Sequence, residues 1–161
     1  SQINYIVLNK GKKDHLKEGM GIIDPNGNAV GIITSLSDDY AMVMSLLHKD
    51  SHISGKLLKT GETGTMLWDG ADPSILTMTG ITKSAKITLG DQIITSGFST
   101  AFPIGFKIGT INKVYNEKSN NNFKITCKAT ANFYNLIYVY VIQNKDQDGV
   151  TALLERVKTQ Q

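Results

Sequence analysis

The alternation of apolar and polar side chains with a period of two residues is the feature that most constrains this 161-residue chain. Between Phe123 and Ala131 every second residue is apolar, and the residues between them are lysine or threonine. Successive side chains of a β-strand point to opposite faces, so this segment is predicted to be a strand with one buried and one solvated face. Shorter β-rich runs recur along the chain, at residues 5–8, 30–36, 40–47, 65–68, 92–95 and 137–142.

Turn-forming residues separate these runs. The Asp-Pro-Asn-Gly sequence at 24–27 combines a proline with a residue that tolerates positive φ, which favours a tight reversal. The 15 glycines are dispersed, as many short strands and corners require. Helical periodicity is convincing only at residues 150–157, and that stretch lacks a strong apolar face. The predicted fold class is therefore all-β.

The two halves of the chain resemble each other. Residues 16–23 are echoed by residues 87–94, and residues 30–33 by residues 108–111, in the same order. Such internal similarity is typical of a duplicated unit. Closing each sheet into a barrel removes exposed edges, and two small barrels gain by packing together. We predict two small β-barrels side by side, with residues 1–80 in the first, 81–145 in the second and 146–161 as a polar tail. The final strand can instead return to the first barrel.

Charge and cysteine content exclude several classes of protein. The net charge is +3, and the 17 lysine and arginine residues form no basic run, so no nucleic-acid partner is expected. A single cysteine, Cys127, precludes an internal disulfide, and its position in the alternating strand predicts a buried thiol. No stretch of about 20 apolar residues is present to span a membrane, and no signal peptide is visible.

A metal site is the first catalytic candidate considered. His48, Asp50 and His52 would share one face of an extended strand and could converge on zinc. A fourth ligand is not evident, so the segment is interpreted as a polar loop, and no metal or cofactor is expected.

A pair of small β-barrels also raises the question of a serine protease. Histidine occurs only at positions 15, 48 and 52, and the serines beside glycine, Ser54 and Ser96, lack the sequence context of a nucleophile. We therefore expect no catalytic residues and no enzymatic activity.

The apolar segment at residues 97–106 is the candidate contact site. It contains three phenylalanines and an isoleucine, and Pro103 would break any strand ladder through it. Phe102 is predicted to plug the second barrel, whereas Ile104 and Phe106, on either side of a glycine, are predicted to lie nearer the surface and to contribute to self-association or partner binding.

Several of these segments resemble one bacterial family. Residues 4–11, followed by 16–20, resemble the opening of the extracytoplasmic β domain of the rod-shape-determining protein MreC family. The most specific match lies in the second half, in Gly90-Asp91, residues 93–97, Phe102-Pro103 with Gly105, and Ile108-Gly109. The resemblance covers residues 4 to 143 in order. One departure is Phe106, where the family often has proline.

The resemblance implies a fold, a function and a location. The implied fold is two chymotrypsin-like β-barrels without protease residues. The implied function is a non-catalytic scaffold of the bacterial cell-wall elongation machinery, which maintains rod shape on the periplasmic side of the inner membrane. A membrane anchor and a coiled coil would precede this segment. The implied partners are a second copy, MreD, RodZ and the elongation-specific penicillin-binding transpeptidase.

Two alternative functions stay open at this point. One is a degenerate or active hydrolase built on a double barrel. The other is a peptidoglycan or glycan-binding module, since Trp68, Tyr115 and Tyr134 could stack on sugars.

Overall fold

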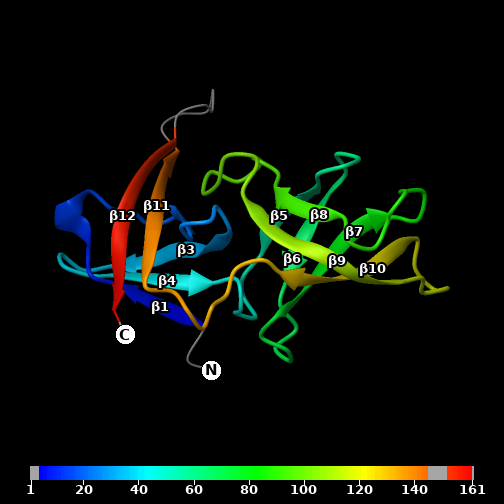
Figure 1. The fold of residues 1–161 in the computed structure, drawn as a ribbon, viewed down its shortest axis with the longest axis horizontal. Helices are drawn as coiled ribbons and strands as arrows, with labels where there is room; N and C mark the ends of the chain where they lie inside the picture. Colours follow the sequence, from blue (N-terminus) through cyan, green and yellow to red (C-terminus); the bar gives the residue numbers. More distant parts are fainter. Residues whose placement is uncertain (1–3, 145–151, 161) are drawn as a thin grey trace.

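The computed structural model describes residues 4–144 and 152–160. These residues form twelve β-strands and one short 3-10 helix, η1 (Lys12–Asp14) (Figure 1). The strands are β1 (Tyr5–Leu8), β2 (Gly21–Ile23), β3 (Ala29–Leu36), β4 (Ala41–Ser45), β5 (Ile53–Leu57), β6 (Thr63–Leu67), β7 (Ile75–Thr82), β8 (Gln92–Thr95), β9 (Lys107–Tyr115), β10 (Asn122–Ala129), β11 (Tyr138–Asn144) and β12 (Ala152–Gln160).

The strands close into two barrels of six strands each. The order around the first is β1-β12-β11-β2-β3-β4, and the order around the second is β10-β7-β6-β5-β8-β9. The barrels lie side by side along the long axis of the molecule (Figure 1). The prediction of an all-β protein built from two small barrels is confirmed.

The strand pairing divides the chain differently from the predicted ranges of 1–80 and 81–145. Strands β5 to β7 belong to the second barrel, so the boundary falls between Ser45 and Ile53, and the first barrel is completed by β11 and β12. The predicted polar tail, 146–161, contains β12, which pairs with β11 over seven residues. The sequence echo marks equivalent strands within the barrels, but it does not mark where each barrel begins in the chain.

The first barrel is a circularly permuted copy of the second. Around each barrel, β11-β12-β1-β2-β3-β4 occupies the same places as β5-β6-β7-β8-β9-β10. The second barrel is therefore continuous in sequence. The first barrel takes two of its six strands from the C-terminal end of the chain, after the second barrel has been completed.

Equivalent glycines show the duplication at residue level. Gly31 lies opposite Ile22 across β2 and β3, and Gly109 lies opposite Ile93 across β8 and β9. A Cβ atom on Gly31 would come within 2.3 Å of a backbone oxygen of β4, and one on Gly109 within 2.8 Å of a backbone oxygen of β10. Each barrel thus needs glycine where one strand passes close over its neighbour.

Equivalent bulges lie three residues after each of these glycines. The register between β3 and β4 shifts around Thr34, and the register between β9 and β10 shifts around Asn112. Bulges increase local strand twist and help small sheets to close. The two barrels therefore share this bulge as well as their apolar pattern, as a duplicated unit predicts.

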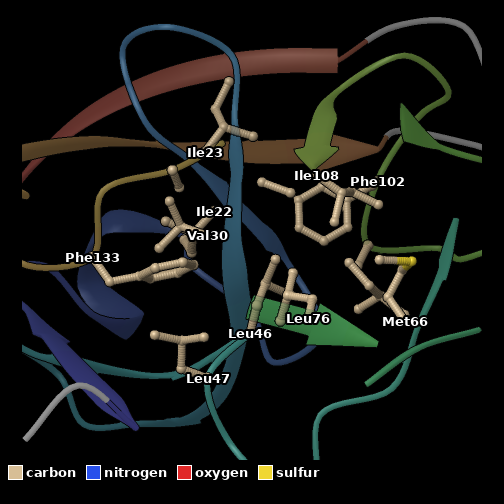
Figure 2. Packing of buried hydrophobic residues seen from close by; sticks show 14 of the residues in the cluster. Ile22, Ile23, Val30, Leu46, Leu47, Met66, Leu76, Phe102, Ile108 and Phe133 are labelled. Atoms are coloured by element: carbon tan, nitrogen blue, oxygen red, sulfur yellow. The ribbon is translucent and has the colours of Figure 1, made fainter. Parts of the chain in front are cut away.

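One hydrophobic cluster runs through both barrels. It joins first-barrel residues such as Ile22 and Val30 to second-barrel residues such as Met66 and Ile108 (Figure 2). A backbone hydrogen bond of 3.0 Å from the Lys107 N–H to the Gly27 carbonyl also connects the β2–β3 turn to β9.

Within the described residues, no helix is long and apolar enough to cross a bilayer.

Candidate partner-binding loop

The segment between β8 and β9, residues 96–106, presents apolar side chains to solvent. Ile104 is 56% exposed, as predicted, and Phe98 is 77% exposed. The loop lies against the first barrel (Figure 1), where its Thr100 lines a cleft together with Met20 and Gln143. In the first barrel the corresponding β2–β3 connection is only a short turn. The second copy therefore carries an insertion that displays large apolar groups.

A buried threonine fixes the shape of this loop. The Oγ1 of Thr95 donates a hydrogen bond to the Pro103 carbonyl (2.7 Å) and accepts one from the Phe106 N–H (3.0 Å). The Thr95 carbonyl accepts from the Gly105 N–H at 3.1 Å. Gly97 and Gly105 have φ values of +84° and +112°, which L-residues with a side chain rarely adopt. The exposed side chains are thus held on a backbone fixed by hydrogen bonds. A fixed backbone would lose less conformational entropy if the loop bound a partner.

Phe102 anchors the loop where the two barrels meet. Its side chain is 1% exposed, and its ring approaches Gly21 of β2 so closely that a Cβ there would lie 2.7 Å from the ring. The prediction that Phe102 is buried is confirmed, but the prediction that it plugs the second barrel is incomplete, because it also packs against the first. Figure 2 shows Phe102 and Ile108 within the shared core. The missing side chain of Gly21 makes room for the ring.

Phe106 is less accessible than predicted. It is only partly buried, but it packs against the core, and its ring centroid lies 6.4 Å from that of Phe102. Its N–H is also held by Thr95. Phe106 therefore supports the loop, and Phe98 replaces it as the second exposed apolar group. Sequence reasoning missed Phe98, although its position between a glycine and a serine favours exposure in a turn.

The histidine segment is organised as a turn. The Nδ1 atom of His48 accepts a hydrogen bond from the Asp50 N–H at 2.9 Å, and the His48 ring packs edge-on against Tyr5 with centroids 4.9 Å apart. His52 lies beside the Asp50 carbonyl, with 3.1 Å between its Nδ1 and that oxygen. Across residues 4–144 and 152–160, no group of three His, Cys, Asp or Glu side chains is arranged to hold a metal ion.

The two serines considered as nucleophiles contact each other. The Ser96 hydroxyl donates to the Ser54 hydroxyl at 2.8 Å. Within the part of the chain that the structure describes, neither hydroxyl is hydrogen-bonded to an imidazole. A serine needs an adjacent base to become nucleophilic. The Ser54–Ser96 hydrogen bond instead connects β5 to the end of β8, which is a structural role.

The aromatic residues proposed for sugar stacking do not form one platform. Trp68 is buried, and its Nε1 donates to the Asp72 carbonyl at 2.9 Å, so its ring is not available to a ligand. Tyr115 lies under the ammonium group of Lys124, 5.7 Å from the ring centroid. Tyr134 is exposed on the segment between β10 and β11.

Cys127 is confirmed as a fully buried thiol, and burial raises its pKa to about 12. We expect negligible labelling of the native protein by a thiol reagent at pH 8, because the reactive thiolate is absent and the sulfur is covered. The thiol ionises in the unfolded chain near pH 9, well before it does so in the folded one. Burial of the neutral thiol therefore makes its full contribution to the free energy of unfolding below pH 9. That contribution declines as the pH rises from 9 towards 12. Rapid native labelling at pH 8 would contradict this burial.

The strand topology and the loop define a class: an all-β protein of two six-stranded barrels with an apolar loop exposed between β8 and β9. The chain belongs to the MreC family, because its residues 1–143 match the model of the rod shape-determining protein MreC, barrel core. The resemblance found in the sequence is thereby confirmed.

Two curated relatives match most of the chain. The cell shape-determining protein MreC of Listeria monocytogenes is 28% identical over 151 residues, which cover 92% of this chain and 51% of the relative. The protein of the same name from Haemophilus influenzae is 26% identical over 143 residues, which cover 89% of this chain and 40% of the relative. The chain thus spans about half or less of the length of these relatives.

Solved structures share the fold. The structure of MreC from Listeria monocytogenes aligns with a TM-score of 0.83 and 27% identity, covering 92% of this chain and 71% of that one. A complex between penicillin-binding protein PBP2 and MreC from Helicobacter pylori aligns with a TM-score of 0.65 and 22% identity, covering 80% and 79%. A major periplasmic domain from the cell shape-determining filament MreC aligns with a TM-score of 0.69 and 18% identity, covering 97% and 86%.

Proposed function

We propose that this chain is the extracytoplasmic part of a non-catalytic scaffold that maintains cell shape by holding wall-synthesis proteins together. Its membership of a cell shape-determining family supports this role. The observation that carries the proposal is the rigid loop between β8 and β9, which exposes Phe98 and Ile104 to solvent. Exposed apolar groups on a preorganised backbone are typical of a protein-binding surface.

The partner proposed for the loop is a penicillin-binding transpeptidase. The Helicobacter pylori MreC relative is in complex with such a protein, which supports a transpeptidase partner for this chain. Self-association and contacts with MreD and RodZ are further proposals that follow from the family resemblance. So is an upstream membrane anchor that would keep the barrels at the periplasmic face of the inner membrane, a location that a periplasmic structural relative supports.

Binding should depend on the exposed loop residues. We expect Phe98→Ser and Ile104→Ser each to weaken binding of the transpeptidase's extracytoplasmic part by about tenfold or more, because an apolar side chain buried at an interface contributes roughly 1.5–3 kcal/mol. Biolayer interferometry with the matched transpeptidase measures the affinity, and light scattering measures self-association in the same samples.

Leu89→Ser is the matched control, because Leu89 is 64% exposed but lies before β8 and outside the loop. It should bind as the unmodified protein does. Equal losses at Leu89 and Ile104, or no loss at any of the three positions, would place the contact surface elsewhere on the barrels.

A further inference from the structure

A polar cleft of about 340 Å³ lies between the β2–β3 turn and the segment that connects β10 to β11. Its walls include Asp24, Asn26 and Asn28 on one side and Asn132, Asn135 and Tyr138 on the other. Neither the β8–β9 loop nor the aromatic residues considered from the sequence line this cleft. A volume of this size falls within the range of small-ligand sites in proteins.

The wall formed by the β2–β3 turn is rigid. The Oδ1 atom of Asp24 accepts hydrogen bonds from the N–H groups of Asn26 and Asn28, both at 2.9 Å. Its Oδ2 atom accepts from the Nδ2 of Asn28 at 2.8 Å. The Lys107 N–H fixes the same turn to the second barrel through the Gly27 carbonyl. Both carboxylate oxygens of Asp24 are therefore engaged within the turn.

The opposite wall is held by β12. The hydroxyl of Thr159 lies 2.8 Å from the carbonyl oxygens of both Leu136 and Ile137. The Thr159 N–H donates a further hydrogen bond of 2.9 Å to the Ile137 carbonyl. The cleft is thus preformed from both sides, which reduces the ordering that a ligand would have to impose.

Asn28 carries a buried side-chain oxygen for which the described residues supply no hydrogen-bond donor. The residue is only 6% exposed, and its Nδ2 donates to Asp24. Among the residues that the structure describes, no donor reaches its Oδ1 atom. Buried side-chain oxygens are nearly always hydrogen-bonded. Because Asn28 lines the cleft, its unpaired oxygen indicates a missing donor from a ligand or water.

The lining restricts the chemical class of the ligand. No lysine or arginine is among the described residues around the cleft, and one carboxylate is, which disfavours an anion. Over residues 4–144 and 152–160, every strand is paired on two sides, so these residues offer no free sheet edge to an extended peptide. Amide side chains offer donors and acceptors together, as neighbouring hydroxyl groups require. Ile137 and Tyr138 add apolar surface for the C–H face of a sugar ring.

We propose that this cleft binds an uncharged glycan, with the Oδ1 of Asn28 accepting a hydrogen bond from a sugar hydroxyl or acetamido group. The ring of Tyr138 contacts the apolar face of a sugar, and Asn132 and Asn135 bond its hydroxyls. The site is separate from the β8–β9 loop, so the chain can hold a protein partner and a polysaccharide at two different surfaces.

Nuclear magnetic resonance on the nitrogen-15-labelled 161-residue chain tests the proposal, with chitotetraose as the probe. The expected result is a saturable shift of the amide signals of Asn28, Asn132 and Asn135, with a Kd of about 1 mM or tighter. Tyr138→Ala and Asn135→Ala should each weaken binding about fivefold while the melting temperature stays close to that of the unmodified protein. Tyr115→Ala is the control, because Tyr115 is a tyrosine of comparable exposure outside the cleft, and it should bind normally.

Three outcomes would overturn the glycan site. The first is the absence of any shift in these amides at 10 mM chitotetraose (~10 times the expected Kd), which would leave water as the partner of Asn28. The second is shifts with an uncharged tetra-alanine peptide and none with the glycan. The third is equal losses in Tyr115→Ala and Tyr138→Ala. Ile104→Ser should bind the glycan normally, so failure of the loop proposal and failure of this one are distinguishable.

Discussion

Deletion of residues 152–160 should unfold the first barrel and leave the second barrel folded. Without β12, β11 loses the seven-residue pairing from Tyr138 to Asn144, and β1 loses its pairing through Val7 and Leu8. Both strands would then be unpaired edges of an open sheet. The loss should approach the whole stability of a small domain, which is about 5–15 kcal/mol.

The amide spectrum of the truncated chain measures this effect barrel by barrel. Signals from β5 to β10 should keep their dispersion, whereas signals from β1 to β4 should collapse towards random-coil positions. Thr159→Val is the control, because it removes one hydroxyl bonded to two carbonyls but keeps the strand, and it should cost only about 1–3 kcal/mol. Native spectra for both barrels in the truncated chain would show that β12 is dispensable.

Phe102→Ser should be the most destabilising single substitution in the β8–β9 loop. Removing a buried phenylalanine side chain costs about 3–5 kcal/mol, and a buried hydroxyl without a partner adds to that cost. Because Phe102 contacts Gly21 across the junction, the change should also weaken the coupling between the barrels. Urea unfolding followed by fluorescence of Trp68 reports on the second barrel, and circular dichroism reports on both.

Neighbouring substitutions in the same loop provide the comparison. Phe106→Ser should cost roughly 1–2 kcal/mol, since Phe106 is only partly buried, and Ile104→Ser should cost less than about 0.5 kcal/mol. The expected order of destabilisation is therefore Phe102, Phe106, Ile104. Equal losses at all three positions would mean that the whole loop is core and that no part of it serves as a contact surface.

The sequence was sufficient to predict the architecture because its strongest signals are local. Alternation at residues 123–131 predicted β10 and the burial of Cys127, and both are confirmed. The echo of Val30-Gly31 in Ile108-Gly109 predicted two similar barrels. In the structure these glycines, and the bulges three residues after them, occupy equivalent positions in the two barrels. The connectivity was not predictable in the same way, because pairing between β1 and β12 joins residues at opposite ends of the chain and leaves no local pattern.

The candidate sites were less predictable for a related reason. Composition identified residues 97–106 as an apolar corner, and Ile104 is exposed as predicted. The different environments of Phe98 and Phe106 depend on Thr95, whose hydroxyl bonds the far side of the loop. The polar cleft was missed entirely, since its two walls come from the β2–β3 turn and from residues 130–138, far apart in sequence. Only the folded chain brings them together.

The permuted first barrel has a consequence for the order of folding. During synthesis, β1 to β4 appear first but cannot close, because their partners β11 and β12 follow the whole second barrel. The second barrel uses contacts within residues 53–129, so it can form as soon as that segment is available, whereas the first depends on contacts between the chain ends, which form slowly. The early strands meanwhile expose open edges that are prone to aggregation, a period in which chaperone binding would be most useful. The chain is therefore expected to fold from its middle outward.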